Sequence, residues 1–143
     1  MKSEDTVDYY LRKTWLKVSK MYNQIAAPYG LTQSIGFILL NIDPKKGTPS
    51  TQLGPMMGME PTSLSRTLKA IEGKGWIVKR SDASDGRVTR ILLTDEGHRL
   101  RAISRETVVS FNQKLLEEIG AERFKEFVKV MDIIDVHSTK KKI

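Results

Sequence analysis

Two short amphipathic segments joined by a tight turn constrain this chain more than any other feature of its sequence. In the first segment, Thr48 and Pro49 have the residue types of a helix N-cap and of the first helical position. The residues that follow place Leu53, Met56 and Met57 on one side, and Gly58 ends the pattern. We therefore expect a short helix over residues 49–57 that buries those three side chains.

The second segment follows the turn Gly58-Met59-Glu60. Pro61 suits the first position of a helix, and Gly73 suits its end. Between them, Leu64, Leu68 and Ile71 recur at the spacing of one buried helical stripe. Two short helices that meet across so tight a turn have the spacing of a helix-turn-helix.

A β-hairpin is predicted directly after the second helix. Residues 76–80 and 88–93 are rich in β-favouring side chains, and the turn formers of residues 81–87 separate them. Four cations surround this short turn, so the hairpin has a basic rim formed by Lys79, Arg80, Arg87 and Arg90.

Amphipathic helices are predicted on both sides of this central region. Before it, apolar residues recur at helical spacing over residues 7–27 and again over 32–42, where Thr32 is a good N-cap. After it, Thr94 and the acidic residues next to it begin a long helix that Gly120 interrupts. We expect that helix to bury four apolar side chains, Leu100, Ile103, Phe111 and Leu115. A last amphipathic helix carries Phe124, Phe127, Val128, Met131 and Ile134 on one side and precedes a polar tail over residues 138–142.

The charge balance indicates a polyanionic partner. Lys and Arg number 24 against 17 Asp and Glu, which gives a formal net charge of +7. Residues 61–94 contain seven basic and three acidic residues, so they carry a net +4 of that total. Nucleic acid and an acidic membrane surface are the two leading candidates. The sequence has no apolar run near the ~20 residues of a membrane span and no secretory signature, so we expect a soluble, cytoplasmic protein.

The outward side of the helix after the turn has hydrogen-bonding side chains suited to reading DNA. The major groove admits one α-helix, in which Arg bonds guanine bidentately and Ser or Thr bonds bases or phosphates. The candidate DNA-binding residues on this helix are Thr62, Ser63, Ser65, Arg66 and Lys69. A merely solvated polar face is the alternative for this pattern, because most surface helices are polar outside.

The hairpin strengthens the DNA interpretation. Asp85 lies two residues before Arg87 and can hold it extended through a charge-assisted hydrogen bond. Narrow minor grooves concentrate negative potential and attract an inserted arginine. We therefore add Asp85, Arg87 and Arg90 to the candidate DNA-binding residues, against the alternative of a solvated surface hairpin.

Asp85-Gly86-Arg87 followed by Ile91-Leu92-Leu93-Thr94-Asp95-Glu96-Gly97 resembles the wing signature of the MarR family of winged-helix regulators. Gly30-Leu31-Thr32 is similar to the entry to that family's second helix. Residues 64–68 and 75–77 are similar to its recognition helix and to the strand after it. The order and spacing of these segments agree over nearly the whole chain.

The resemblance implies a mainly α fold with a small β-hairpin wing. It implies a single unit over residues 1–143, with a DNA-binding lobe over 32–94 and a helical dimerisation lobe formed by 5–27 and 95–137. The partners would be double-stranded DNA and a second copy of the chain, and the homodimer would bind a palindromic operator as a repressor. Arg87 would enter the minor groove with Asp85 orienting it. The aromatic bulk of the flanking helices fits a dimer, although ordinary core packing is the alternative.

The resemblance raises two structural questions, the course of the first helix of the motif and the presence of a ligand pocket. Gly54-Pro55 stands where the family usually has good helix formers, so the first helix of the motif is expected to be short or bent. Many family members release DNA when a small aromatic or phenolic anion binds. Here Tyr10, Trp15, Tyr22 and Phe37 are candidates for lining such a pocket, or they are core residues.

The sequence also bears on two other function classes. An enzyme is disfavoured because the two histidines, His98 and His137, lack metal-ligand spacing, and no phosphate loop or nucleophile motif is present. We accordingly expect no cofactor. The absence of cysteine excludes disulfides, thiolate metal sites and cysteine-based peroxide sensing. A non-specific architectural DNA-binding protein, also basic and dimeric, remains the alternative to a sequence-specific regulator.

Overall fold

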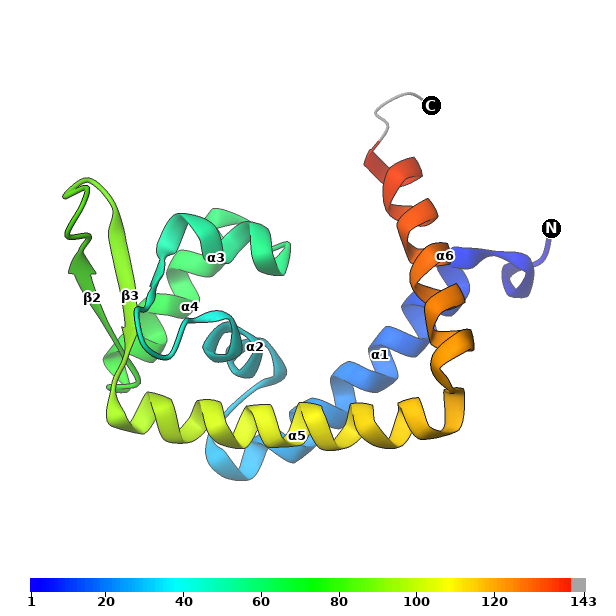
Figure 1. The fold of residues 1–143 in the computed structure, drawn as a ribbon, viewed down its shortest axis with the longest axis horizontal. Coiled ribbons are helices and arrows are strands. Elements are labelled where there is room, and N and C mark those ends of the chain that lie inside the picture. Colours follow the sequence, from blue (N-terminus) through cyan, green and yellow to red (C-terminus); the bar gives the residue numbers. More distant parts are fainter. Residues whose placement is uncertain (140–143) are drawn as a thin grey trace. The chain divides into compact units, whose positions relative to one another are not determined.

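The computed structural model describes residues 1–139 and consists mainly of helices with one small sheet (Figure 1). Two short 3₁₀ helices are η1 (Ser3–Asp5) and η2 (Ala27–Tyr29). The α-helices are α1 (Val7–Ala26), α2 (Gln33–Asn41), α3 (Ser50–Met57), α4 (Pro61–Gly73), α5 (Asp95–Ile119) and α6 (Ala121–Thr139). The strands are β1 (Thr48–Pro49), β2 (Ile77–Ser81) and β3 (Thr89–Leu93). The predicted fold class is confirmed.

Contacts divide the chain into two compact units. The first runs from Met1 to Arg105 and contains the winged helix, and the second begins at Glu106. The predicted division into a DNA-binding lobe and a dimerisation lobe is a different partition and stays a prediction. Of the predicted polar tail, residues 138 and 139 belong to α6, and residues 140–142 lie outside the described residues.

The first two long helices begin and end where their capping residues indicate. The Thr6 hydroxyl oxygen accepts a hydrogen bond from the Tyr9 N–H at 3.3 Å, and the Thr32 hydroxyl oxygen accepts one from the Ile35 N–H at 3.2 Å. After α1, Gly30 has φ +73°, a left-handed conformation that favours glycine, and the chain turns there into α2. Both predicted helices are confirmed, but most apolar side chains of α1 are exposed in the single chain.

The predicted N-cap of the third helix is wrong. Thr48 and Pro49 form β1, which pairs with β3, and α3 begins only at Ser50. The Thr48 hydroxyl accepts a hydrogen bond from the Asp43 N–H at 2.9 Å and lies 3.4 Å from the Asn41 carbonyl oxygen, so it stabilises the preceding loop. Leu53 is fully buried as expected and Met57 is half-buried, whereas Met56 is 55% exposed, so its predicted burial is also wrong.

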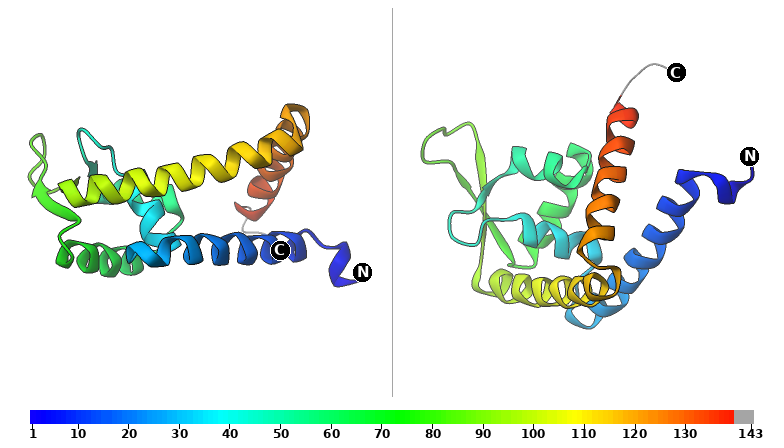
Figure 2. Two further views of the ribbon diagram at one scale, coloured as in Figure 1. Left: turned by 90° about the horizontal axis from the view of Figure 1, so that it is seen from below. Right: turned by 45° about the vertical axis from the view of Figure 1, so that its right-hand side comes forward.

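The sheet has the strand order β1-β3-β2, and both neighbours of β3 run antiparallel to it. The predicted hairpin is confirmed with every strand boundary within one residue of that expected, and its register pairs Ile77 with Leu93 and Arg80 with Arg90. The β2–β3 loop extends away from α3 and α4 in all the ribbon views (Figure 2).

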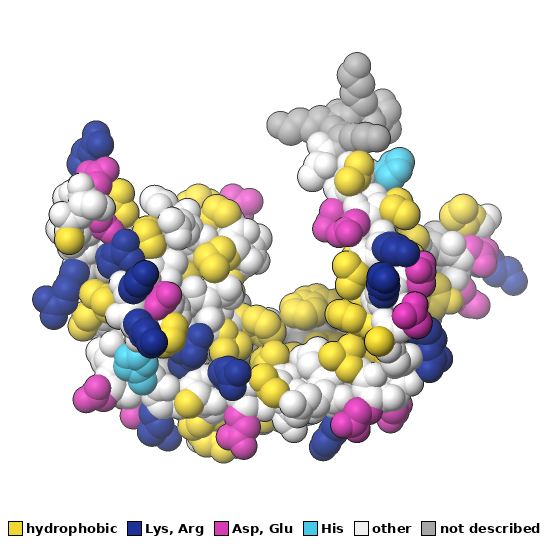
Figure 3. All heavy atoms as spheres, in the orientation of Figure 1, with side chains coloured by type: hydrophobic (Ala, Val, Ile, Leu, Met, Phe, Trp, Pro, Cys, Tyr) yellow, Lys and Arg dark blue, Asp and Glu magenta, His cyan; other side chains and the backbone are white. Residues whose placement is uncertain are grey.

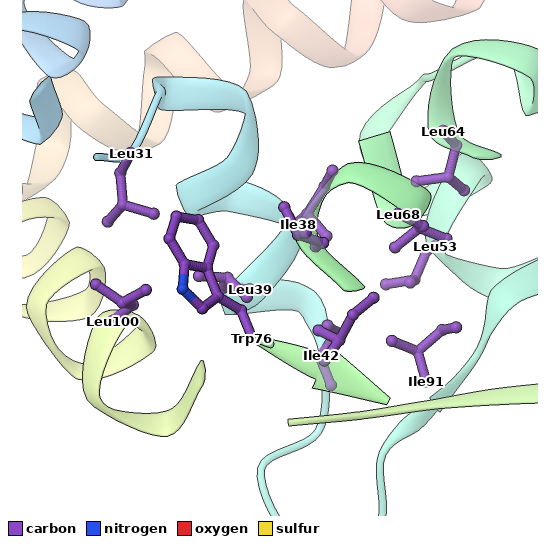
Figure 4. Close-up of a cluster of buried hydrophobic side chains, with 12 residues drawn as sticks. Leu31, Ile38, Leu39, Ile42, Leu53, Leu64, Leu68, Trp76, Ile91 and Leu100 are labelled. Atoms are coloured by element: carbon purple, nitrogen blue, oxygen red, sulfur yellow. The ribbon is translucent and has the colours of Figure 1, made fainter. Parts of the chain in front are cut away.

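The core of the first unit lies between α2, α4, the sheet and the start of α5. Trp76 lies among Leu31, Leu39 and Leu100 at one end of this core, and Leu53, Leu64 and Leu68 gather at the other (Figure 4). Ile38, Leu39, Ile42, Leu53, Ile71, Ile77, Ile91 and Leu100 are fully buried. This packing fixes the two helices of the helix-turn-helix and the hairpin against one another.

The beginning of α5 is held close to the backbone of Trp76, the residue just before β2. Thr94 caps the helix by accepting a hydrogen bond from the Gly97 N–H at 3.1 Å, and the Thr94 N–H donates to the Trp76 carbonyl at 3.1 Å. Of the four side chains expected to be buried along α5, Leu100 is buried, Ile103 and Phe111 are half-buried, and Leu115 is 37% exposed. The helix ends before Gly120, which has φ +81°.

The last helix, α6, buries none of its residues in the single chain. Phe124, Phe127 and Val128 are 41%, 54% and 40% exposed, and apolar side chains are visible on the surface of this helix in Figure 3. Within residues 1–139, no helix combines the length and the apolar character required to cross a membrane.

Candidate nucleic-acid interface

The turn between α3 and α4 is built by backbone hydrogen bonds at the end of α3. Gly58 has φ +62°, and its N–H lies 3.4 Å from the Pro55 carbonyl oxygen, while the Met59 N–H donates to the Gly54 carbonyl at 3.0 Å. Pro61 then occupies the first position of α4, where a missing N–H costs nothing. The two helices form the predicted helix-turn-helix.

Pro55 lies inside α3, and the helix continues through it to Met57. The expectation of a short first helix is therefore confirmed, because α3 has only eight residues. Gly54 is buried, and a Cβ added there would lie 3.3 Å from the Met59 carbonyl oxygen and 3.6 Å from the Leu64 side chain. Glycine at this position lets α3 approach the turn and α4 closely.

The outward face of α4 contains all five predicted helix residues. Leu64, Leu68 and Ile71 are buried on one side, and the opposite side exposes Thr62, Ser63, Ser65, Arg66 and Lys69. The side chains of Arg66 and Lys69 make no hydrogen bond or ion pair within residues 1–139. This face therefore offers two uncommitted cations and three hydroxyl groups to a partner.

At the tip of the hairpin, Asp85 holds Arg87 in an extended position. One carboxylate oxygen of Asp85 accepts hydrogen bonds from both the backbone N–H and the Nε–H of Arg87, each at 3.1 Å. The other oxygen accepts from Nη2 at 3.3 Å. These bonds lower the pKa of Asp85 below its ordinary value. The Arg87 side chain is nevertheless 91% exposed, so it is oriented by a fork-to-fork contact while it faces solvent.

The β2–β3 loop is fixed where it leaves β2 by a second aspartate, Asp82, whose side chain is only 7% exposed. One carboxylate oxygen accepts hydrogen bonds from the Ser84 N–H at 2.8 Å and the Ser84 hydroxyl at 2.5 Å. The other accepts from Arg90, with Nη2 at 2.6 Å and Nε at 2.8 Å. The hydrogen bonds from Ser84 and Arg90 hold the pKa of Asp82 far below its ordinary value.

Arg90 is placed differently from the other predicted DNA-binding residues. Besides Asp82, its guanidinium donates to the carbonyl oxygens of Lys46 and Gly47 at 3.2 and 3.3 Å. Its side chain is 30% exposed and its donors are directed toward the protein. The geometry thus supports a structural role for Arg90, which joins the hairpin to the loop before β1, and DNA contact by this residue stays a prediction.

Sequence reasoning passed over Asp82, although the signal was present. An aspartate two residues before a serine in a cluster of turn formers is typical of an Asx turn, in which the carboxylate accepts the N–H two residues ahead. Sequence reasoning also passed over β1, whose two residues are too few to give a periodic pattern.

The other predicted cations lie on exposed positions of the winged helix. Arg80 is exposed and pairs with Arg90 in the strand register, and Lys79 makes a loose ion pair with Glu72 at 3.7 Å. Figure 3 shows Lys and Arg side chains gathered over the β2–β3 side, with a cation at the tip of the hairpin. The helix face and the hairpin together form a basic surface.

The four aromatic residues considered for a ligand pocket separate into two groups. Tyr22 is buried, and its ring packs edge-on against Phe37 with the ring centroids 5.9 Å apart. Tyr10 and Trp15 are 55% and 52% exposed on α1. Tyr22 and Phe37 therefore have the geometry of core residues.

Residues 31–89 match the model of the MarR family. The repressor CouR bound to a 23-mer DNA duplex is 25% identical, with a TM-score of 0.77 over 92% of this chain and 94% of that one. The S. aureus MepR–DNA complex is 19% identical with a TM-score of 0.82 over 92% and 98%. CouR from Rhodococcus jostii RHA1 bound to p-coumaroyl-CoA is 19% identical, with a TM-score of 0.76 over 100% and 99%.

Proposed function

We propose that this MarR-family winged helix-turn-helix protein binds specific sequences of double-stranded DNA and represses transcription. The observation that carries the proposal is Arg87, which is 91% exposed at the hairpin tip yet oriented by Asp85. An arginine held in this way has already lost much of its conformational freedom in the free protein, so it can enter a minor groove at low additional entropic cost. The exposed face of α4 would then lie in the adjacent major groove.

The two DNA complexes among the similar structures support this proposal, because both share the fold over nine-tenths of the chain. No enzymatic role is proposed. The exposed groups on the helix face and the hairpin are cations and hydroxyls, and they include no nucleophile placed beside a general base.

The first test recovers the DNA that the full-length protein prefers. Sheared genomic DNA of the source organism is passed over the purified protein, and the retained fragments are sequenced and used in competition binding. A specific regulator prefers its own site over random duplex by about a thousandfold or more. Equal affinity for both at the same salt concentration would instead establish the architectural alternative.

Arg87 is tested with a matched control. Arg87→Ala should weaken binding to the recovered site by about 1–3 kcal/mol, the range of a good groove contact. Arg99→Ala is the control, because Arg99 is also an exposed arginine bonded in a fork to an acidic neighbour, Glu96, but lies on α5. Wild-type affinity for Arg87→Ala, or an equal loss in both variants, would exclude the hairpin from recognition.

We further propose that the protein binds a palindromic operator as a homodimer. In support, α1 and α6 each expose large apolar side chains, among them Trp15 at 52% and Ile133 at 60%. Sedimentation of the full chain at micromolar concentration should give a dimer, and Ile133→Glu should shift it toward the monomer. A wild-type monomer that binds a single half-site with full affinity would overturn this proposal.

We also propose that a small aromatic effector modulates DNA binding. The support is one of the similar structures, a CouR complex that contains p-coumaroyl-CoA. Titration of p-coumaroyl-CoA and of simple phenolic acids into the protein–DNA complex tests it, with release of the labelled duplex as the readout. Unchanged DNA affinity with every compound at millimolar concentration would contradict an effector of this class.

A further inference from the structure

Methionine is concentrated at the turn of the helix-turn-helix. The chain contains six methionines, and three of them, Met56, Met57 and Met59, lie within four consecutive residues. Without cysteine, these thioethers are the oxidisable sulfur atoms closest in sequence to the proposed reading helix.

The three side chains have different surroundings. Met56 is 55% exposed on the outer side of α3. Met57 and Met59 are half-buried and pack against the central core cluster. Met59 also lines an open groove of about 630 Å³ between α3 and α4, together with Gly54, Gly58 and Leu64. The groove therefore gives small reagents in solution access to Met59, a residue that takes part in the packing of this junction.

The junction depends strongly on this packing because α3 has little stability of its own. The helix has eight residues, its N-cap Pro49 provides no side-chain hydrogen bond, and Pro55 inside it provides no N–H. Its position therefore depends on Leu53, Met57 and the turn residue Met59. The space is tight, since even a Cβ at Gly54 would lie 3.3 Å from the Met59 carbonyl oxygen.

We propose that Met57 and Met59 form an oxidant-sensitive modification site whose conversion to sulfoxide weakens DNA binding, an inference that rests on the proposed function. The oxidant class is a two-electron oxygen donor such as hypochlorous acid. Its oxygen atom transfers to the methionine sulfur, which loses two electrons, and chloride and a proton are released. The sulfoxide is polar and accepts hydrogen bonds, whereas the core cluster that the two side chains pack against consists of aliphatic side chains and Trp76.

The mechanical consequence follows from the position of the two sulfurs. A polar sulfoxide moves toward water and withdraws its side chain from the junction, so α3 and the turn lose contacts that hold the start of α4. The exposed face of α4 then no longer meets the groove in one fixed orientation. Oxidation of Met56 has no such effect, because its side chain is already in water.

The test uses the full-length protein with its recovered duplex. A few equivalents of hypochlorous acid are added, peptide mass spectrometry locates the sulfoxides, and DNA affinity is measured. We expect sulfoxide at Met57 and Met59 to lower affinity by about tenfold or more, the effect of one unsatisfied buried polar group. Treatment with methionine sulfoxide reductases A and B and a thiol should restore it.

Variants in the same four residues provide the matched control. Met57→Leu/Met59→Leu, a volume-conserving change, should retain DNA affinity after oxidation, and Met56→Leu should remain as sensitive as the wild type. Sulfoxide at both positions without loss of affinity, or equal loss in the double leucine variant, would overturn the proposal. So would failure of the two sulfurs to react.

A readout without DNA separates this proposal from the proposed function. Oxidation should lower the thermal unfolding temperature of the wild type but not that of the double leucine variant, whatever the protein binds. If the untreated protein shows no sequence preference while this difference in stability is found, the DNA function is wrong and the modification site is supported. An unchanged unfolding temperature in both proteins contradicts the modification site alone.

Discussion

Substituting Gly97 with alanine tests the close approach of α5 to the backbone of Trp76, the residue just before β2. Gly97 lies in the first turn of α5 and is buried. A Cβ built on it would overlap the carbonyl oxygen of Trp76 and lie 3.3 Å from the Leu93 side chain. The overlapping atom belongs to the backbone, so no rotation of a side chain relieves the contact.

The expected magnitude combines three terms. Alanine is favoured over glycine inside a helix by about 1 kcal/mol. Overpacking against an immobile group costs about 1–3 kcal/mol, and a backbone carbonyl belongs at the upper end of that range. Displacing that carbonyl also weakens its hydrogen bond from the Thr94 N–H, worth about 1 kcal/mol net. Gly97→Ala should therefore lower the free energy of unfolding by about 2–3 kcal/mol.

Urea unfolding followed by circular dichroism measures this change, with every protein at the same protomer concentration because a dimer's stability depends on it. Gly73→Ala is the matched control, since Gly73 also lies in a helix but a Cβ there meets nothing within 4 Å. The control should be unchanged or more stable by up to about 1 kcal/mol. If Gly97→Ala is as stable as the wild type, α5 does not approach Trp76 as described.

Three further substitutions test the exposed face of α4, the β2–β3 loop and the core. Arg66→Ala should relax base preference at one position of the recovered site by about 1–3 kcal/mol, and an equal loss on every sequence would make Arg66 a phosphate contact. Asp82→Asn should make the free energy of unfolding depend less on pH in acid. The folded pKa of Asp82 lies below its unfolded value, so the stability that this carboxylate contributes is complete above about pH 4 and is lost as the pH falls toward the folded pKa. Identical acid unfolding of this variant and the wild type would remove Asp82 from that role. Ile38→Ala, at a fully buried site, should cost about 2–5 kcal/mol in urea unfolding, and a loss below 1 kcal/mol would show that the core repacks there.

Sequence reasoning located the helices well because their signals are local. Thr32, Pro61 and Thr94 mark helix beginnings through capping chemistry that depends on neighbours a few residues away. The stripe of Leu64, Leu68 and Ile71 gave the buried side of α4 for the same reason.

The errors arose where the deciding partner is distant in the sequence. Thr48-Pro49 has the residue types of a helix start, but pairing with Ile91 and Arg90 of β3 makes it a strand. Arg90 was grouped with Arg87 because both are basic residues near the same turn. Its distinct surroundings come from carbonyl oxygens of Lys46 and Gly47, more than forty residues earlier, which no local pattern reveals. The exposure of Leu115 likewise depends on what packs against α5 rather than on helical spacing.

The strand order β1-β3-β2 has a consequence for how the helix-turn-helix folds. The helix-turn-helix is inserted between β1 and β2, and both of these strands are paired with β3, which follows them in the chain. The segment from Thr48 to Ser81 is thus a loop whose two ends are joined by β3, the last of the three strands in the chain. Loop closure costs entropy before native contacts compensate for it, so we expect α3 and α4 to gain their fixed geometry only after residues 89–93 have joined the sheet. A chain that stops before β3 would have the face of α4 that is proposed to contact DNA, but not the strand that fixes its position.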